Sequence, residues 1–170
     1  ILKQLRHIYR GRIGAEFAHV STGEERLWLQ DRFQEGRLHY RFDREERLNL
    51  LWQLSAAEGL ERYLHTRYVG QKRFSLEGAE ALIPLLDLVA DEAAALGVDE
   101  IVFGMPHRGR VNVLANILRK PYEMVLADFE GSMLAREATG DGDVKYHLGY
   151  SHDRTTAAGQ RIHLSLSANP

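Results

Sequence analysis

The sequence contains no cysteine, and this absence excludes disulfide bonds, thiolate metal sites and a cysteine nucleophile. It is compatible with a reducing compartment. No apolar run reaches the roughly 18 residues that a membrane-spanning helix requires, so we expect no membrane contact. The 22 lysines and arginines are interleaved with 24 aspartates and glutamates, so no block of one charge favours a nucleic-acid partner. Any anion-binding site must therefore be local.

The rest of the composition is that of an ordinary globular protein, with 44% hydrophobic and 27% charged residues among 170. The sequence begins without a methionine or a signal-peptide core, and it stops directly after a strand-like run. We therefore expect it to be a piece of a longer chain.

The first part of the sequence is predicted to be helical. Apolar residues spaced for one helical face indicate a short helix over 26–36. Asp43, followed three residues later by Glu46, is typical of a capping box, and it begins a longer helix that runs toward Gly70. Residues 1–77 are thus expected to form a helical N-terminal layer.

The pattern changes from residue 78 onward. Hydrophobic periodicity predicts, in order, helix 79–96, strand 100–104, helix 111–118, helix 121–129 and strand 162–167. Strand, loop and helix in succession are typical of an α/β fold, in which the loop lies at the carboxyl end of a parallel strand. We expect strand 100–104 to be buried and residues 131–161 to be irregular. Residues 78–170 are interpreted as the first part of an α/β domain.

The loop after strand 100–104 is the first candidate site. It contains His107, Arg108, Gly109 and Arg110. Imidazole, guanidinium groups and the free amides of a helix N-terminus meet there, and this combination suits a phosphate or a carboxylate. From the spacing alone, solvated loop residues around a turn glycine are an equally weighted alternative.

The second candidate site is the segment 143–151. Here His147 follows Lys145 and Tyr146, among glycines that let the backbone approach a ligand. A structural role for His147 is an equally weighted alternative. Five other histidines lack partners at metal-binding spacing, and they are His19, His39, His65, His152 and His163. There is also no His-Glu-x-x-His zinc motif and no nucleophile elbow, so no metal site is predicted.

Taken together, these motifs resemble the first, decarboxylating component of 2-oxoglutarate dehydrogenase complexes, from about Tyr9 onward. The matching segments occur in the same order, and they are 12–17 with 28–29, 72–78, 104–110 with 112–114, and 142–147. A chance match of all of them is implausible.

The resemblance implies both a fold and a set of site residues. The fold is an N-terminal helical layer followed by part of a thiamine-diphosphate-binding parallel-sheet domain. His107 and His147 would be catalytic and contact the substrate, Ser151 would lie beside them in the substrate site, and Arg108 would belong to the cofactor pocket. These residue types suit the implied ligands. A dianionic substrate and a diphosphate need several fixed hydrogen-bond donors, which histidine and arginine supply.

The activity implied by the resemblance is the oxidative decarboxylation of 2-oxoglutarate in the tricarboxylic acid cycle. Thiamine diphosphate and Mg²⁺ would be the cofactors. The succinyl group would pass to a lipoyl domain of the dihydrolipoyl succinyltransferase component, within a multienzyme complex whose first component is a homodimer. The cytoplasm of a bacterium is favoured over the mitochondrial matrix.

The family's magnesium ligands and its activating glutamate are expected beyond Pro170. The cofactor domain is therefore expected to be incomplete here, and the 170 residues inactive alone. Gly140–Gly142 followed by Asn169 has nearly the spacing of the family's metal fingerprint, but no strand-like segment precedes it. We reject this metal site, because a three-residue motif in a glycine-rich segment arises easily by chance.

Two alternatives stay open. The first component of 2-oxoadipate dehydrogenase shares the loop 105–110, although Lys145 and Tyr146 before His147 favour 2-oxoglutarate. The other alternative is a non-catalytic module that binds an anion or docks a partner, in which the histidines are structural.

Overall fold

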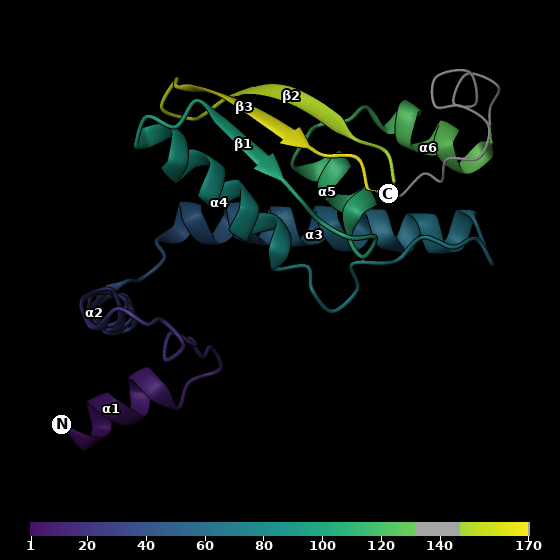
Figure 1. Cartoon of the computed structure of the whole chain (residues 1–170). Coiled ribbons are helices and arrows are strands. Elements are labelled where there is room, and N and C mark those ends of the chain that lie inside the picture. Colours follow the sequence, from purple (N-terminus) through teal and green to yellow (C-terminus); the bar gives the residue numbers. More distant parts are fainter. Residues whose placement is uncertain (132–146, 170) are drawn as a thin grey trace. The chain divides into compact units, whose positions relative to one another are not determined.

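The computed structural model describes residues 1–131 and 147–169. The chain divides into two compact units, Ile1–Arg47 and Leu48–Pro170. Figure 1 shows the elements of both units in chain order. The domain boundary that we expect between residues 77 and 78 is a different kind of division from these compact units. The expected domains, 1–77 and 78–170, stay a prediction. Within the described ranges, no helix is long and apolar enough to cross a bilayer.

The first unit is built from α1 (Leu2–Tyr9) and α2 (Gly23–His39). Helix α2 extends beyond the expected range 26–36 at both ends. The apolar face that predicted it is largely open, since Trp28 is 61% exposed and the described α2 has no buried residue. The two helices meet through Phe33, whose ring centroid lies 6.1 Å from that of Tyr9.

Helix α3 (Arg44–Arg67) begins with the predicted capping box. The backbone nitrogen of Glu46 donates to Asp43 Oδ1 at 2.9 Å, and the backbone nitrogen of Asp43 donates to Glu46 Oε2 at 2.7 Å. The two reciprocal bonds satisfy backbone donors that would otherwise lack partners at the helix start. The prediction of a long helix from Asp43 is confirmed.

The second unit contains a three-stranded sheet in the order β1-β3-β2. Strand β1 (Glu100–Phe103) pairs in parallel with β3 (Arg161–Leu166), and β2 (Tyr150–Thr155) pairs antiparallel with β3. Two expectations were wrong. Strand β2 lies within the stretch expected to be irregular, and β1 is not buried, because Val102 is 63% exposed.

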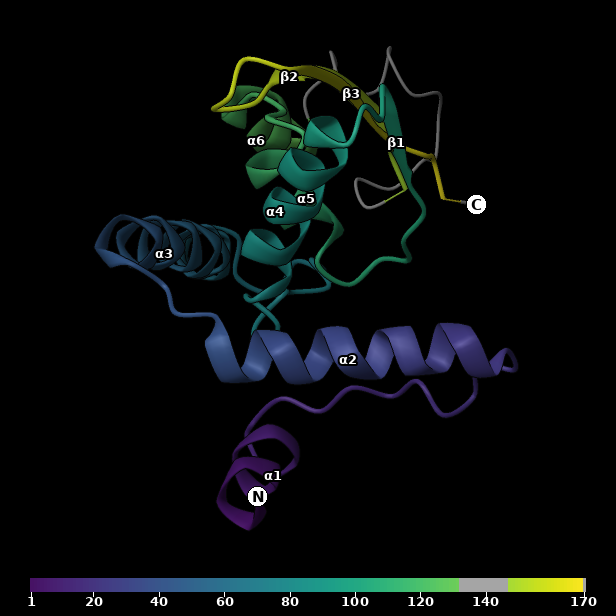
Figure 2. The same ribbon diagram turned by 90° about the vertical axis from the view of Figure 1, so that its left-hand side faces the viewer.

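Helices α4 (Leu82–Ala95), α5 (Arg110–Asn116) and α6 (Tyr122–Glu130) follow the predicted order. Figure 2 shows them on one side of the sheet. The core between sheet and helices consists mainly of residues from β3, α4 and the α5 region, namely Ile162, Leu164, Leu166, Ile83, Ala90, Val113, Leu114, Ile117 and Leu118. Burying these apolar side chains fixes α5 against β3. The start of α5 and the loop before it are thereby held near the end of the sheet.

A second apolar cluster joins α3 to α5 and α6. Its buried members are Leu60, Leu64, Tyr68, Val111, Ala115, Val125 and Phe129. The Tyr68 and Phe129 rings are stacked with their centroids 5.1 Å apart. Helix α5 thus lies between the two clusters, which explains why every residue from Arg110 to Asn116 is buried. The second unit is a mixed sheet with packed helices, and its assignment to a thiamine-diphosphate-binding fold stays a prediction.

Candidate functional site

The loop that joins β1 to α5 adopts a fixed conformation at its last residue. Gly109 has φ +77°, in the left-handed region, and it forms the N-cap of α5. Its backbone nitrogen donates to the carbonyl of Phe74 at 2.9 Å. A Cβ at this position would lie 2.5 Å from Cδ1 of the buried Leu76. Both the backbone conformation and the close approach therefore require glycine.

The central finding at this site is a pair of histidines that are 40 residues apart in sequence. Nε2 of His107, in the β1–α5 loop, lies 2.8 Å from Nε2 of His147, just before β2. The two ring planes are 13° from parallel, with centroids 4.7 Å apart. Both side chains are half-buried. The structure thus brings together the two residues that the sequence predicted as catalytic.

The distance between the two nitrogens restricts how protons are placed. A hydrogen bond between two Nε2 atoms requires one of them to carry a proton and the other to accept it. Two protonated Nε2 atoms would repel each other at this separation. The contact therefore holds one proton between the two Nε2 atoms, and one imidazole acts as the donor while the other acts as the acceptor.

An aromatic ring lies next to the histidine pair, and a cationic group lies beside that ring. The Phe74 ring centroid is 4.8 Å from that of His107, with the planes 32° apart. Phe74 has φ +44°, which is unusual for a side chain of its size. Lys72 Nζ lies 5.3 Å from the centroid of the Phe74 ring. The segment 72–78, which carried part of the family resemblance, is therefore in contact with the histidine loop.

Arg108, the predicted cofactor ligand, is exposed at the same loop. Its Nη2 donates to the backbone carbonyl of Glu77 at 2.8 Å. This bond uses one of the five N–H donors of the guanidinium, so the group is oriented and still has donors for an anion. Arg108 and His107 are adjacent in sequence, so a single loop presents both kinds of donor.

Arg110 was expected to be a donor in the loop, and this expectation was wrong. It is the first residue of α5 and is 0% exposed. Its guanidinium donates to backbone carbonyls, among them those of Met105 at 3.0 Å and Leu148 at 2.7 Å. A buried cation needs such partners, because leaving it without them would be very unfavourable. Arg110 is therefore part of the framework of the site and not of its surface.

Sequence reasoning also missed a buried polar cluster beneath the site. Glu61 is 3% exposed and Asn112 is 0% exposed. Asn112 Nδ2 donates to Glu61 Oε1 at 3.1 Å and to the Ala57 carbonyl at 2.9 Å. The available signal was the placement of Asn112 among apolar residues of the helix, since a polar residue on a buried face needs partners.

Ser151, the other predicted substrate contact, lies in β2 opposite Ser165 and is exposed. Among the described residues, no side-chain hydrogen bond joins it to His107 or His147. Lys145 and Tyr146, together with the rejected Gly140–Gly142 segment, lie outside the described residues.

Asn169 belonged to the rejected metal site. Its backbone nitrogen donates to the carbonyl of His147 at 2.9 Å, so it supports the loop of that histidine. Within the described ranges, no group of three or more histidine or acidic side chains could hold a metal ion.

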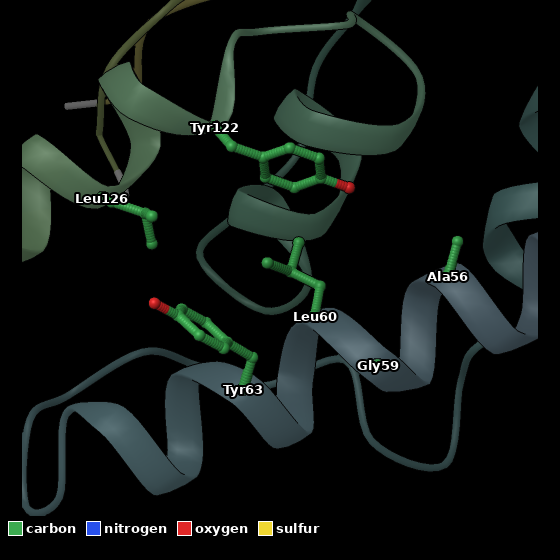
Figure 3. Close-up of a pocket in the computed structure, with 6 residues that line it drawn as sticks. All are labelled: Ala56, Gly59, Leu60, Tyr63, Tyr122 and Leu126. Atoms are coloured by element: carbon green, nitrogen blue, oxygen red, sulfur yellow. The ribbon is translucent and has the colours of Figure 1, made fainter.

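A separate groove of about 380 Å³ lies between α3 and α6. Its lining consists of Ala56, Gly59, Leu60, Tyr63, Tyr122 and Leu126. Figure 3 shows the Tyr63 and Tyr122 rings on its opposite walls, one from each helix. None of these six lining residues carries a carboxylate, an imidazole or an amine, so the groove does not offer the donors and bases that the histidine site offers.

Near the end of α3, Tyr68 donates its hydroxyl to Glu130 Oε1 at 3.0 Å. Burial raises the pKa of the Tyr68 phenol, and the hydrogen bond and charge of Glu130 raise it further. The phenol thus stays protonated and links α3 to the end of α6, where it stabilises the helices that support α5.

No model of a known protein family matches the sequence. The chain is 49% identical over 171 aligned residues to the 2-oxoglutarate dehydrogenase E1/E2 component of Corynebacterium glutamicum. It is 48% identical over 171 aligned residues to the multifunctional 2-oxoglutarate metabolism enzyme of Mycolicibacterium vanbaalenii. Each alignment covers 100% of this chain and 14% of the relative, so the chain spans about a seventh of the length of the relatives that it matches.

Proposed function

The chain is homologous over its whole length to a segment of 2-oxoglutarate dehydrogenase proteins, and from this relationship we propose that its histidine pair acts in the oxidative decarboxylation of 2-oxoglutarate. The observation that carries the proposal is the 2.8 Å contact between Nε2 of His107 and Nε2 of His147. Two segments that match the family separately in sequence meet there in one site.

The chemistry of the substrate class agrees with this site. A 2-oxo dicarboxylate carries two negative charges and a carbonyl oxygen, so its recognition needs fixed hydrogen-bond donors. His107 and His147 offer imidazole N–H groups in a half-buried position, where a hydrogen bond to a charged group is stronger than in water. In the proposed role the pair binds a carboxylate of the substrate and holds a proton at Nε2.

Arg108 is the residue that would hold the diphosphate of the cofactor. Its guanidinium is already oriented by the Glu77 carbonyl and retains donors on an exposed loop, which suits a diphosphate oxygen. With thiamine diphosphate bound, the chemistry supplied is a carbon nucleophile and an electron sink for decarboxylation. The ligands of the accompanying Mg²⁺ are proposed to come from other parts of the enzyme.

The partners follow from the same proposal. The succinyl product would pass to a lipoyl domain of the dihydrolipoyl succinyltransferase component, in a multienzyme complex of the tricarboxylic acid cycle. The Corynebacterium relative is named as an E1/E2 component, which supports this partner. A homodimeric first component in the cytoplasm of a bacterium completes the proposal, and both relatives come from bacteria.

Substitution of His147 tests the proposed function. In the enzyme that carries this segment, His147→Leu should lower kcat/KM for 2-oxoglutarate by about 10- to 150-fold, since a hydrogen bond to a charged group contributes about 1.5–3 kcal/mol. The exposed His65 in α3 provides the matched control, and His65→Leu should leave kcat/KM unchanged.

The same assay with 2-oxoadipate as substrate distinguishes a 2-oxoglutarate dehydrogenase from a 2-oxoadipate dehydrogenase. A wild-type kcat/KM that is higher for 2-oxoadipate than for 2-oxoglutarate would reassign the substrate. Equal kcat/KM values for 2-oxoglutarate in His147→Leu and His65→Leu would remove His147 from the site.

A further inference from the structure

Arg110 connects the two loops that carry the histidines. Its Nη1 donates to the carbonyl of Met105 at 3.0 Å, two residues before His107. Its Nε and Nη2 both donate to the carbonyl of Leu148, at 3.1 and 2.7 Å, one residue after His147. One buried guanidinium is thus bonded to the backbone on both sides of the histidine pair.

The guanidinium is also bonded to the end of the sheet. Its Nη2 donates to the carbonyl of Ser167, directly after β3. The same Nη2 lies 3.5 Å from the carbonyl of His147. The backbone nitrogen of Ser167 in turn donates to the carbonyl of Phe103 at 3.1 Å, at the end of β1. Arg110 therefore holds both histidine loops against the same end of the sheet, where β1 and β3 meet.

The shape of the guanidinium makes this arrangement specific to arginine. The group is planar, and its N–H donors point in fixed directions, so the carbonyls that accept from it are held at fixed mutual distances. A lysine at the same position would keep the positive charge but would present one small ammonium group. It could not reach Met105 on one side and Leu148 on the other with the same geometry.

We propose that Arg110 is a positioning residue that holds His107 and His147 at hydrogen-bonding distance, an inference that rests on the proposed function for its catalytic consequence. Arg110 is 0% exposed, so it acts through the backbone carbonyls that it binds and not through the substrate. A displacement of about 1 Å in a catalytic group can lower a rate by about 100-fold. The separation of the histidines is therefore a property that the reaction would depend on.

The test compares Arg110→Lys and Arg110→Met with Lys120→Met in the enzyme that carries this segment. Lys120 is a matched control, because it is also a buried cation in the α5 region, 5% exposed. Its ammonium pairs with Asp128 of α6 at 2.8 Å, away from the carbonyls that Arg110 binds. Its loss should therefore reproduce the general effect of removing a buried charge.

The first measurement does not depend on activity. Diethylpyrocarbonate acylates neutral imidazole nitrogens, and mass spectrometry gives the rate at each histidine. In both Arg110 variants the rates at His107 and His147 should rise by roughly fivefold, because the Nε2 contact that protects them is broken. The rate at the exposed His65 should stay constant in every folded variant.

The second measurement is steady-state kinetics with 2-oxoglutarate. Arg110→Lys should lower kcat by about 100-fold, with a smaller change in KM, if the geometry of the pair matters in the transition state. Lys120→Met should keep the wild-type labelling rates and kcat.

Two outcomes have distinct meanings. Labelling rates at His107 and His147 that rise no more in Arg110→Lys than in Lys120→Met would overturn the positioning role. Raised labelling rates with an unchanged kcat would support Arg110 as the residue that holds the pair, and would overturn the proposed catalytic use of that pair.

Discussion

Glu61 Oε1 accepts a hydrogen bond from the backbone nitrogen of Leu76 at 3.0 Å, in a position where Glu61 is 3% exposed. The same oxygen accepts from Asn112 Nδ2 at 3.1 Å, and Arg73 Nε lies 3.6 Å from the other carboxylate oxygen. One carboxylate of α3 thereby fixes both α5 and the segment that contacts the histidine loop.

Removal of this carboxylate should destabilise the fold. We expect Glu61→Ala to lower the free energy of unfolding by about 2–4 kcal/mol. The change leaves the buried backbone N–H of Leu76 without its acceptor, removes one of the two acceptors of Asn112 Nδ2 and takes away the buried charge beside Arg73. Urea unfolding followed by circular dichroism measures this change. Glu58→Ala, which removes an exposed ion pair with Arg62 on the same helix, should cost less than about 1 kcal/mol. The role of Glu61 would be refuted by equal losses in the two variants.

Gly109 and Gly159 give a matched pair for the backbone of the site. Both have positive φ, +77° and +84°, so an alanine at either position costs about 1–2 kcal/mol in conformational strain. Only at Gly109 would the new Cβ meet Leu76 Cδ1 at 2.5 Å, whereas nothing lies within 4 Å at Gly159. Because Leu76 is buried and cannot move freely, Gly109→Ala should cost about 1–3 kcal/mol more than Gly159→Ala.

Thermal and urea unfolding of the two glycine variants measure this difference. If Gly159→Ala proved as destabilising as Gly109→Ala, the contact with Leu76 would not limit the loop.

The hairpin of β2 and β3 carries an acid-sensitive contact. Asp153 Oδ1 lies 2.6 Å from His163 Nδ1, and Asp153 Oδ2 lies 3.2 Å from Arg161 Nη2. The hydrogen bond from His163 holds the pKa of the Asp153 carboxyl below its ordinary 3.8, and Arg161 lowers it further. A carboxyl whose pKa is lowered by folding stabilises the folded state above its ordinary pKa, and this contribution is lost as the pH falls through the folded pKa.

We therefore expect the difference in unfolding free energy between wild type and Asp153→Asn to be present at pH 7 and to shrink in strongly acidic solution, below the ordinary pKa of 3.8. Urea unfolding at a series of pH values measures it. Asp99→Asn, the same change at an exposed aspartate of the same unit, is the control and should show no comparable dependence. A difference that did not vary with pH would exclude a stabilising role for the Asp153 carboxylate.

Helices α2 to α6 were predictable because their apolar periodicity and the capping box at Asp43 are local signals, whereas α1 (Leu2–Tyr9) was not predicted as an element. Strand β2 was not predictable in the same way, because two of its three inward-facing residues, His152 and Arg154, are polar or charged. Arg154 on that side lies 2.6 Å from Asp87 and 2.7 Å from Asp91, both in α4. The alternation of burial is present in β2, but the partners that make an arginine suitable there are more than 60 residues away in sequence.

The candidate site, too, was predictable only where its signals are local. His107 and His147 could be identified from motifs, whereas their 2.8 Å contact could not, since nothing in either segment specifies its distance from the other. Arg110 was misplaced for a related reason. Its acceptors are backbone carbonyls, which are present at every residue and leave no mark in the sequence. The motif has no acidic residue that could pair with Arg110, so the residue types alone do not indicate that this arginine is buried.

The strand order β1-β3-β2 also bears on the entropy of assembling the site. The hairpin contact between Asp153 and His163 joins residues 10 apart, whereas the contact between Phe103 and Ser167 joins residues 64 apart. With closure entropy growing as the logarithm of length, the longer closure costs about 1.6 kcal/mol more. His107 follows β1, and His147 precedes the hairpin. From this difference we expect β1 to open locally before the hairpin does, and that opening would separate the two imidazoles while the hairpin stays formed.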